Sequence, residues 1–220
     1  MPIDTQTTLH ADLVVPEGSH QLVVFAHGSG SSRHSPRNKY VARMLNLGGI
    51  STMLADLMTQ QEEQADEYDG HLRFNIPWLS HRLNAVIDYT LSEVPDTQLL
   101  HHIGLFGAST GAASAIEVAA RRNDVQAVVS RGGRPDLAST EALQTLKCPI
   151  LLLVGGADHA VIELNHAAMK KMTNAADKEM RIVPHATHLF SEPGKLEVVA
   201  RTATQWLSEQ LHHKPEDAPR

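Results

Sequence analysis

The sequence contains a single cysteine, Cys148, among its 220 residues, so no disulfide can form within the chain. The fold is therefore not expected to depend on an oxidising compartment. No apolar run approaches the roughly 18–20 residues that a membrane-spanning helix needs. The first residues also lack the basic and apolar regions of a secretory signal. These absences predict a cytoplasmic protein with no membrane partner.

An excess of basic residues is also missing. The chain has 19 Lys and Arg against 25 Asp and Glu, a formal net charge of -6, which argues against a nucleic-acid partner. Histidine is plentiful, with 14 residues, but no H-E-x-x-H pattern and no Cys/His cluster occurs. We therefore expect no metal site and no cofactor.

What remains is the composition of an ordinary globular protein, with 42% hydrophobic and 20% charged residues. No linker, internal repeat or long low-complexity segment divides the chain. We expect one domain over residues 1–211, followed by a flexible polar tail over residues 212–220, and a monomer or homodimer.

Short apolar runs alternate with longer stretches of helical periodicity. Central strands are predicted at residues 22–26, 51–57, 103–106, 125–130, 150–154 and 179–183. This alternation is typical of an α/β fold with a mostly parallel, doubly wound sheet of about seven strands and helices on both faces. Functional loops then lie at the carboxyl ends of the strands.

Two segments outside this alternation carry their own predictions. The run Thr8–Val15 alternates in polarity and is expected to form an edge strand that pairs antiparallel with its neighbour. The polar stretch Met58–Gly70 is expected to be a mobile loop.

The clearest chemical motif is Gly107-Ala108-Ser109-Thr110-Gly111, which matches G-x-S-x-G, the nucleophile elbow. A predicted strand precedes it and an alanine-rich helix follows. The small flanking residues allow a very sharp turn, which exposes the Ser109 hydroxyl at the start of a helix. Ser109 is therefore the predicted nucleophile.

A second loop, His27-Gly28-Ser29-Gly30-Ser31-Ser32, follows an early strand. In this architecture the second half of the oxyanion hole lies at that position. We assign the two donors to the backbone N–H groups of Thr110 and Ser29, with Gly28 or Gly30 as alternatives to Ser29. A phosphate-binding loop is disfavoured because neither common glycine pattern is complete. His27 is expected to hold the loop rather than to catalyse.

The remaining triad members follow the last two predicted strands. Asp158 lies just after Val154, and His188 lies in the loop after Val183. The chain order Ser, Asp, His is that of α/β-hydrolases. His188 would act as general base, with Asp158 fixing its tautomer. His185 is the main competitor for the role of base.

Three segments together resemble the α/β-hydrolase superfamily, and within it the small dienelactone-hydrolase-like branch: Ala26–Asn38, Gly107–Gly111 and Ser130–Asp136. The resemblance implies the α/β-hydrolase fold. Dienelactone hydrolases proper carry a cysteine nucleophile, whereas this chain has Ser109, and Cys148 lies elsewhere. This departure favours hydrolysis of carboxylic esters in general over dienelactone specificity.

The predicted substrate is a small or medium ester in an open site. Only about twenty residues separate two of the predicted strands, from Ser130 to Ile150, which leaves no room for a cap domain. Phe74 and Trp78 are candidate apolar walls, with core packing as the alternative. Four arginines on predicted loops could bind a substrate carboxylate: Arg33, Arg73, Arg131 and Arg134.

Other functions stay open at this point. A thioesterase, a lactone hydrolase or an acyltransferase would use the same triad with a different acyl donor or acceptor. A non-catalytic binding protein on the same fold is a further alternative, because fold does not fix function. The presence of all three triad residue types favours the enzyme.

Overall fold

The computed structural model describes residues 1–4, 7–94 and 100–212, so residues 213–220 of the predicted tail lie outside the described part. Its centre is a seven-stranded sheet in the order β1-β3-β2-β4-β5-β6-β7. The strands are β1 (Ala11–Val14), β2 (Gln21–Ala26), β3 (Ser51–Ala55), β4 (His102–Ala108), β5 (Val125–Arg131), β6 (Ile150–Gly155) and β7 (Lys178–Val183). The predicted α/β class and strand number are confirmed.

All neighbouring strands of this sheet are parallel except β1, which pairs antiparallel with β3 at the edge. The edge strand predicted over Thr8–Val15 is therefore confirmed. Its half-buried and exposed positions alternate along this outer strand, as the alternating polarity of the sequence requires.

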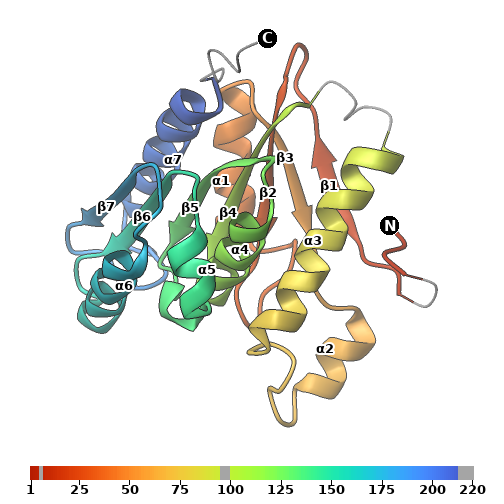
Figure 1. Cartoon of the computed structure of the whole chain (residues 1–220), viewed down its shortest axis with the longest axis horizontal. Coiled ribbons are helices and arrows are strands. Elements are labelled where there is room, and N and C mark those ends of the chain that lie inside the picture. Colours follow the sequence, from red (N-terminus) through yellow and green to blue (C-terminus); the bar gives the residue numbers. More distant parts are fainter. Residues whose placement is uncertain (5–6, 95–99, 213–220) are drawn as a thin grey trace.

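Helices cover both faces of the sheet (Figure 1). They are α1 (Pro36–Leu47), α2 (Gln60–Asp66), α3 (Ile76–Glu93), α4 (Thr110–Arg121), α5 (Thr140–Thr145), α6 (His159–Lys171) and α7 (Lys195–His212). Helices α1 and α7 pack together on one face, and α3, α4, α5 and α6 lie in a row on the other.

The continuous apolar runs of the central strands supply a core on each face. In β2, Leu22 and Val24 belong to the core beneath α3 and α4, whereas Val23 and Phe25 belong to the core beneath α1 and α7. Successive side chains of a strand point to opposite faces, so a run without polar residues buries both. Each such side chain contributes roughly 1.5–3 kcal/mol on full burial.

The segment between β5 and β6 is short, as expected. Residues 132–149 contain only a 3₁₀ turn, Pro135–Leu137, and the six-residue helix α5. No helical cap is inserted there, so this edge of the sheet stays uncovered by a separate layer.

The prediction of a mobile loop over Met58–Gly70 was wrong, because α2 forms within it. Thr59 Oγ1 accepts from the Glu62 N–H, and the Glu62 carboxylate accepts from the Thr59 N–H, at 3.2 and 2.7 Å. This reciprocal pair is a capping box, and the sequence T-x-x-E was its signal. Composition did not indicate the helix, because its residues are almost all polar.

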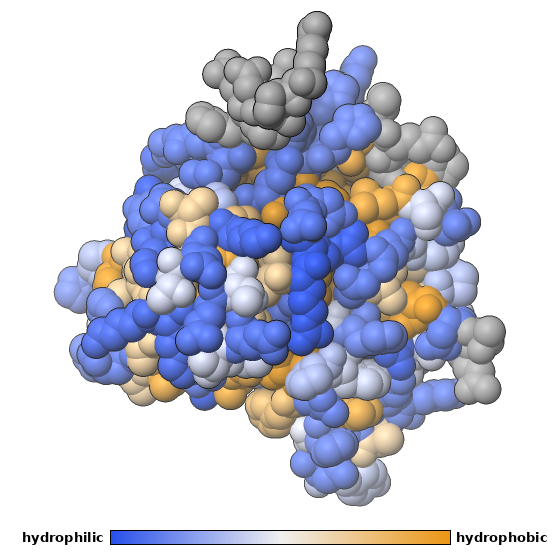
Figure 2. All heavy atoms as spheres, viewed as in Figure 1, coloured by the Kyte–Doolittle hydropathy of each residue, from blue (hydrophilic) through white to orange (hydrophobic). Residues whose placement is uncertain are grey.

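The surface on the side shown in Figure 2 is mainly hydrophilic, with hydrophobic side chains in separate patches. Two of the most exposed apolar side chains, Tyr68 and Phe74, lie on the connection between α2 and α3. In residues 1–4, 7–94 and 100–212, no helix combines the length and apolar character needed to cross a bilayer.

The capping box predicts a local effect on α2. Thr59→Ala should raise the amide hydrogen-exchange rates of residues 62–66 roughly fivefold, because loss of a side-chain cap costs about 1 kcal/mol. Exchange measured by mass spectrometry on the peptide covering α2 checks this. Gln61→Ala, an exposed change in the same turn, is the control; equal exchange in both variants would contradict the role of the cap.

Candidate active site

Ser109 lies at a sharp turn between β4 and α4, with φ 51° and ψ -121°. This backbone conformation is unfavourable for a residue with a side chain, so the surroundings must hold it. Two backbone hydrogen bonds do so: the Ser109 N–H donates to the Arg131 carbonyl at 3.2 Å, and the Arg134 N–H donates to the Ser109 carbonyl at 3.0 Å. The last residue of β5 and the loop that follows it thus hold the turn on both sides.

The two glycines of the motif are required by close contact. A Cβ on Gly107 would lie 2.4 Å from Ala112 Cα, and one on Gly111 would lie 2.2 Å from the Ala26 carbonyl oxygen. Both distances are far inside van der Waals contact. The strand, the turn and the helix can therefore approach this closely only with glycine at both positions.

The structure brings Ser109, His188 and Asp158 together from three separate loops. His188 Nδ1 lies 2.7 Å from Asp158 Oδ2, and His188 Nε2 lies 3.3 Å from Ser109 Oγ. The second distance is slightly long, as is common for such pairs without substrate. With Nδ1–H donating to the carboxylate, Nε2 is left free to accept the serine proton.

The loops that carry Asp158 and His188 are joined by backbone hydrogen bonds. The Gly156 N–H donates to the Val183 carbonyl at 2.8 Å, and the Ala157 N–H donates to the Ala186 carbonyl at 2.9 Å. These bonds link the segment after β6 to the segment after β7. The carboxylate and the imidazole are therefore held in register by the backbone as well as by their own contact.

Neither of the other reactive candidates lies in this group. His185 is exposed, with a positive φ of 61°, and only His188 bridges the serine and the aspartate. Cys148 lies just before β6, at the opposite end of that strand from Asp158. Burial raises the pKa of its thiol to about 12, so it is not an available thiolate.

His27 holds the loop after β2, as the sequence suggested. Its Nε2 accepts from the Leu57 N–H at 2.9 Å, which leaves Nδ1 as the donor to the Gly28 carbonyl at 3.0 Å. The ring is 6% exposed, and burial lowers its pKa below the ordinary value. A neutral imidazole therefore ties the loop to the end of β3.

The backbone N–H groups of this loop are not equivalent. The Ser29 N–H, the predicted second oxyanion donor, donates instead to Thr110 Oγ1 at 2.9 Å. Among the described residues, the N–H groups of Thr110, Gly28 and Gly30 have no protein acceptor. Gly28 is adjacent to Ser109, since a Cβ on Gly28 would lie 3.0 Å from Ser109 Cβ. The geometry thus favours a glycine N–H over that of Ser29.

Three of the four candidate arginines are already paired with carboxylates. Arg33 contacts Asp56, and Arg73 Nε lies 2.5 Å from Asp66. Arg134 makes two bonds of 2.8 Å to Asp136. Arg131 alone of the four has no carboxylate partner in the described structure; its Nη2 donates to Asn38 Oδ1 at 3.2 Å.

The two apolar candidates lie outside the triad. Trp78 is half-buried against the core beneath α3, and the Arg82 guanidinium lies 4.6 Å from its ring centroid. Phe74 is 59% exposed. Packing therefore accounts for Trp78, as the alternative interpretation stated.

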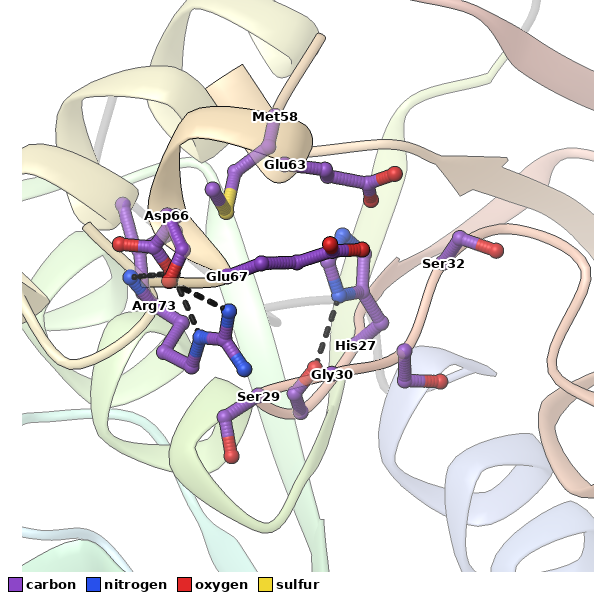
Figure 3. Close-up of a pocket in the computed structure, with 12 residues that line it drawn as sticks. His27, Ser29, Gly30, Ser32, Met58, Glu63, Asp66, Glu67 and Arg73 are labelled. Carbon is purple, nitrogen blue, oxygen red and sulfur yellow. Dashed lines mark hydrogen bonds and ion pairs between the residues drawn. The ribbon is translucent and has the colours of Figure 1, made fainter. Parts of the chain in front are cut away.

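A cavity of about 250 Å³ lies between the His27–Ser32 loop and α2 (Figure 3). Its lining combines serine hydroxyls of the loop with Met58, Leu79 and the carboxylates of Glu63 and Glu67. Burial, reinforced by the charge of Asp56, raises the pKa of Glu63. Ser109, Asp158 and His188 do not line it, but Gly28 does, and a Cβ on Gly28 would lie 3.0 Å from Ser109 Cβ, so the cavity adjoins Ser109 at this glycine.

Several residues that support the site were not predicted from the sequence. Asn165 is fully buried in α6, and its Nδ2 donates to the Gly133 carbonyl at 3.0 Å, which fixes the loop that clamps Ser109. Asp56 and Asp66 neutralise two of the arginines. Their pairing depends on residues 7 to 23 positions apart, and no local pattern marks it. In the described residues, no group of three or more His, Cys, Asp or Glu could hold a metal ion.

Comparison with known proteins agrees with this architecture. The model of the dienelactone hydrolase family matches residues 9–212. The crystal structure of a dienelactone hydrolase from Anabaena variabilis has a TM-score of 0.89 and 48% sequence identity, and the match covers 94% of both chains. Est1E from Butyrivibrio proteoclasticus, with ferulic acid bound, has a TM-score of 0.78 at 19% identity over 97% of this chain and all of that one; this likeness shows the shared fold.

Two curated relatives come from strains of Mycobacterium tuberculosis, and each is named "Putative phosphoribosyl transferase". Each is 48% identical over 200 residues, which is 90% of this chain but 43% of the relative. The chain thus spans less than half the length of these relatives.

The buried neutral His27 predicts a pH effect on stability. Its lowered pKa means that the unfolded chain binds this proton more readily, so its contribution is present above about pH 6.5 and is lost as the pH falls below it. The free energy of unfolding should fall by up to about 1.4 kcal/mol per pH unit more in the wild type than in His27→Gln. Urea titrations between pH 7.5 and 5 check this, with exposed His166→Gln as control; parallel curves for wild type and His27→Gln would contradict it.

Proposed function

Since the chain belongs to the dienelactone hydrolase family, we propose that it is a serine hydrolase that cleaves small to medium carboxylic esters through an acyl-enzyme on Ser109. The single observation that carries the proposal is the hydrogen-bonded chain from Ser109 Oγ through His188 to Asp158. A serine, a base and an orienting carboxylate in this sequence of contacts are the parts that nucleophilic acyl transfer needs.

In the first half of the proposed reaction, His188 Nε2 takes the Ser109 proton while Oγ attacks the ester carbonyl carbon. Asp158 holds the ring and stabilises its positive charge. The tetrahedral intermediate then collapses, and His188 returns the proton to the departing alcohol. In the second half, the same nitrogen takes a proton from a water molecule, which attacks the acyl-serine; as the acyl–oxygen bond breaks and the acid leaves, His188 returns that proton to Ser109 Oγ.

The carbonyl oxygen becomes negatively charged in both halves and needs donors that are free beforehand. The Thr110 N–H meets this requirement, and it lies at the positive end of the α4 dipole. For the second donor the proposal uses Gly28 or Gly30, because the Ser29 N–H is engaged by Thr110 Oγ1. One such donor is typically worth about 10²–10³ in turnover.

The size of the proposed substrate rests on two features. The short segment between β5 and β6 leaves the site without a cap. No inserted layer is therefore present there to enclose a long acyl chain. The cavity beside the loop, at about 250 Å³, would hold on the order of eight water molecules at about 30 Å³ each. This is room for a compact group on one side of the ester.

A lactone is the one alternative substrate that a specific observation favours, namely the match to the dienelactone hydrolase family. Ring opening would follow the same steps, with the alcohol remaining attached to the acid. The name of the mycobacterial relatives describes proteins more than twice as long, and we do not extend phosphoribosyl transfer to this chain.

The triad predicts distinct effects of three substitutions. Ser109→Ala and His188→Ala should each lower kcat for p-nitrophenyl acetate by at least about 10³-fold, because the two residues act as a unit. His185→Ala should keep most of the activity, because that ring is exposed and makes no contact with Ser109. Initial rates for the purified variants check this.

Labelling by a fluorophosphonate tests the nucleophile separately. The wild type should be modified at Ser109, and the Ser109→Ala variant should not. A folded wild-type protein that resists the probe, or a His185→Ala variant as inactive as His188→Ala, would contradict the proposed mechanism.

A further inference from the structure

Most of the buried or half-buried arginines of the described chain have a carboxylate within 4 Å. These are Arg33, Arg73, Arg82, Arg122 and Arg134. Arg37 and Arg131 are the exceptions among the described residues that are not fully exposed. Unpaired guanidinium groups in such positions are costly, because burying a charge without a partner disfavours the charged form.

Arg131 is the more buried of the two, at 6% exposure. It is the last residue of β5, and its side chain reaches α1, where Nη2 donates to Asn38 Oδ1. Its Nε is buried without any partner. A guanidinium has five N–H donors, so one amide oxygen leaves most of them unused.

Arg37 lies beside Asn38 in the first turn of α1 and is half-buried, with Nε also buried and unpartnered. Burial, together with the positive charge of nearby Arg37, lowers the pKa of Arg131 to about 10. The first turn of α1 contains no acidic residue, so the positive end of its dipole is not neutralised there. Three sources of positive potential thus lie near one another, and among the described residues neither guanidinium has a carboxylate within 4 Å.

We propose that Arg37 and Arg131, together with the first turn of α1, form a binding site for an anionic group of several oxygens, a carboxylate or a phosphate. Two guanidinium groups can bind such a group through paired N–H donors, and a helix N-terminus adds favourable potential. The free Nε atoms and the missing counter-charge are the features that an anion would satisfy. The amide of Asn38 holds Arg131 in place for it.

The site adjoins the nucleophile through the backbone. The Arg131 carbonyl accepts from the Ser109 N–H, and Arg131 is paired with Ala108 in the sheet. Arg37 follows directly on the loop that carries the Gly28 and Gly30 N–H groups. We therefore place the anionic group on the ester itself, an assignment that rests on the proposed hydrolase function.

Binding measurements test whether the anion site exists, and activity measurements test whether it binds the ester substrate. The ratio of kcat/KM for mono-p-nitrophenyl succinate to that for p-nitrophenyl acetate should fall about tenfold or more in Arg37→Gln and partly recover in Arg37→Lys. Isothermal titration of the wild type with succinate and with inorganic phosphate should show binding that Arg37→Gln loses. Arg131→Lys should weaken binding in the same way, but Arg37 is the primary position because a half-exposed residue tolerates change.

The matched control is Arg43→Gln, an exposed arginine on the same helix with no carboxylate partner in the described structure. It should leave both readouts unchanged. Absence of anion binding by the folded wild type, or equal loss in Arg43→Gln, would overturn the site. Binding that Arg37→Gln loses with an unchanged ester ratio would overturn its assignment to the substrate. Failure of the hydrolase proposal would give a different result: the wild type would hydrolyse neither ester but would still bind the anion.

Discussion

The structure depends on a close approach of three backbone segments: the end of β2, the end of β4 and the start of α4. The 2.2 Å between a hypothetical Cβ on Gly111 and the Ala26 carbonyl shows that α4 begins almost in contact with the end of β2. Ser109 takes a strained conformation at this contact, and two hydrogen bonds hold it, one to the last residue of β5 and one from the loop that follows. The strain is tolerable because the flanking cores, buried on both faces of the sheet, over-determine the turn.

The segment from His27 to Asn38 joins the features around this turn. His27 ties it to β3, and Thr110 Oγ1 ties it to α4 through the Ser29 N–H. Gly28 and Gly30 then present free N–H groups, and the segment ends in the first turn of α1 beside Arg131. Donors for a developing oxyanion and a site for a substrate anion would therefore be set by one continuous stretch of backbone.

Local patterns were sufficient for much of the fold. Apolar runs without polar interruption predicted the central strands, because such runs bury both faces, and alternation predicted the antiparallel edge strand. Polar composition misled the prediction at α2, where a capping box mattered more than hydrophobicity. Ser109 could be identified because its constraint is local: the turn needs glycine at fixed positions.

The sequence alone thus determined the fold class, the sharp turn at Ser109 and the places of Asp158 and His188 after the last two strands, since each follows from a short-range pattern or from the position of a residue after a strand. Tertiary structure decided which histidine meets the serine, which N–H groups remain free, and which arginines lack a counter-charge. Those properties depend on partners far away in the chain, such as Thr110 for Ser29 and Asp56 for Arg33. Hydrogen bonds and ion pairs act over a few ångströms, so only the folded arrangement shows which groups are already satisfied.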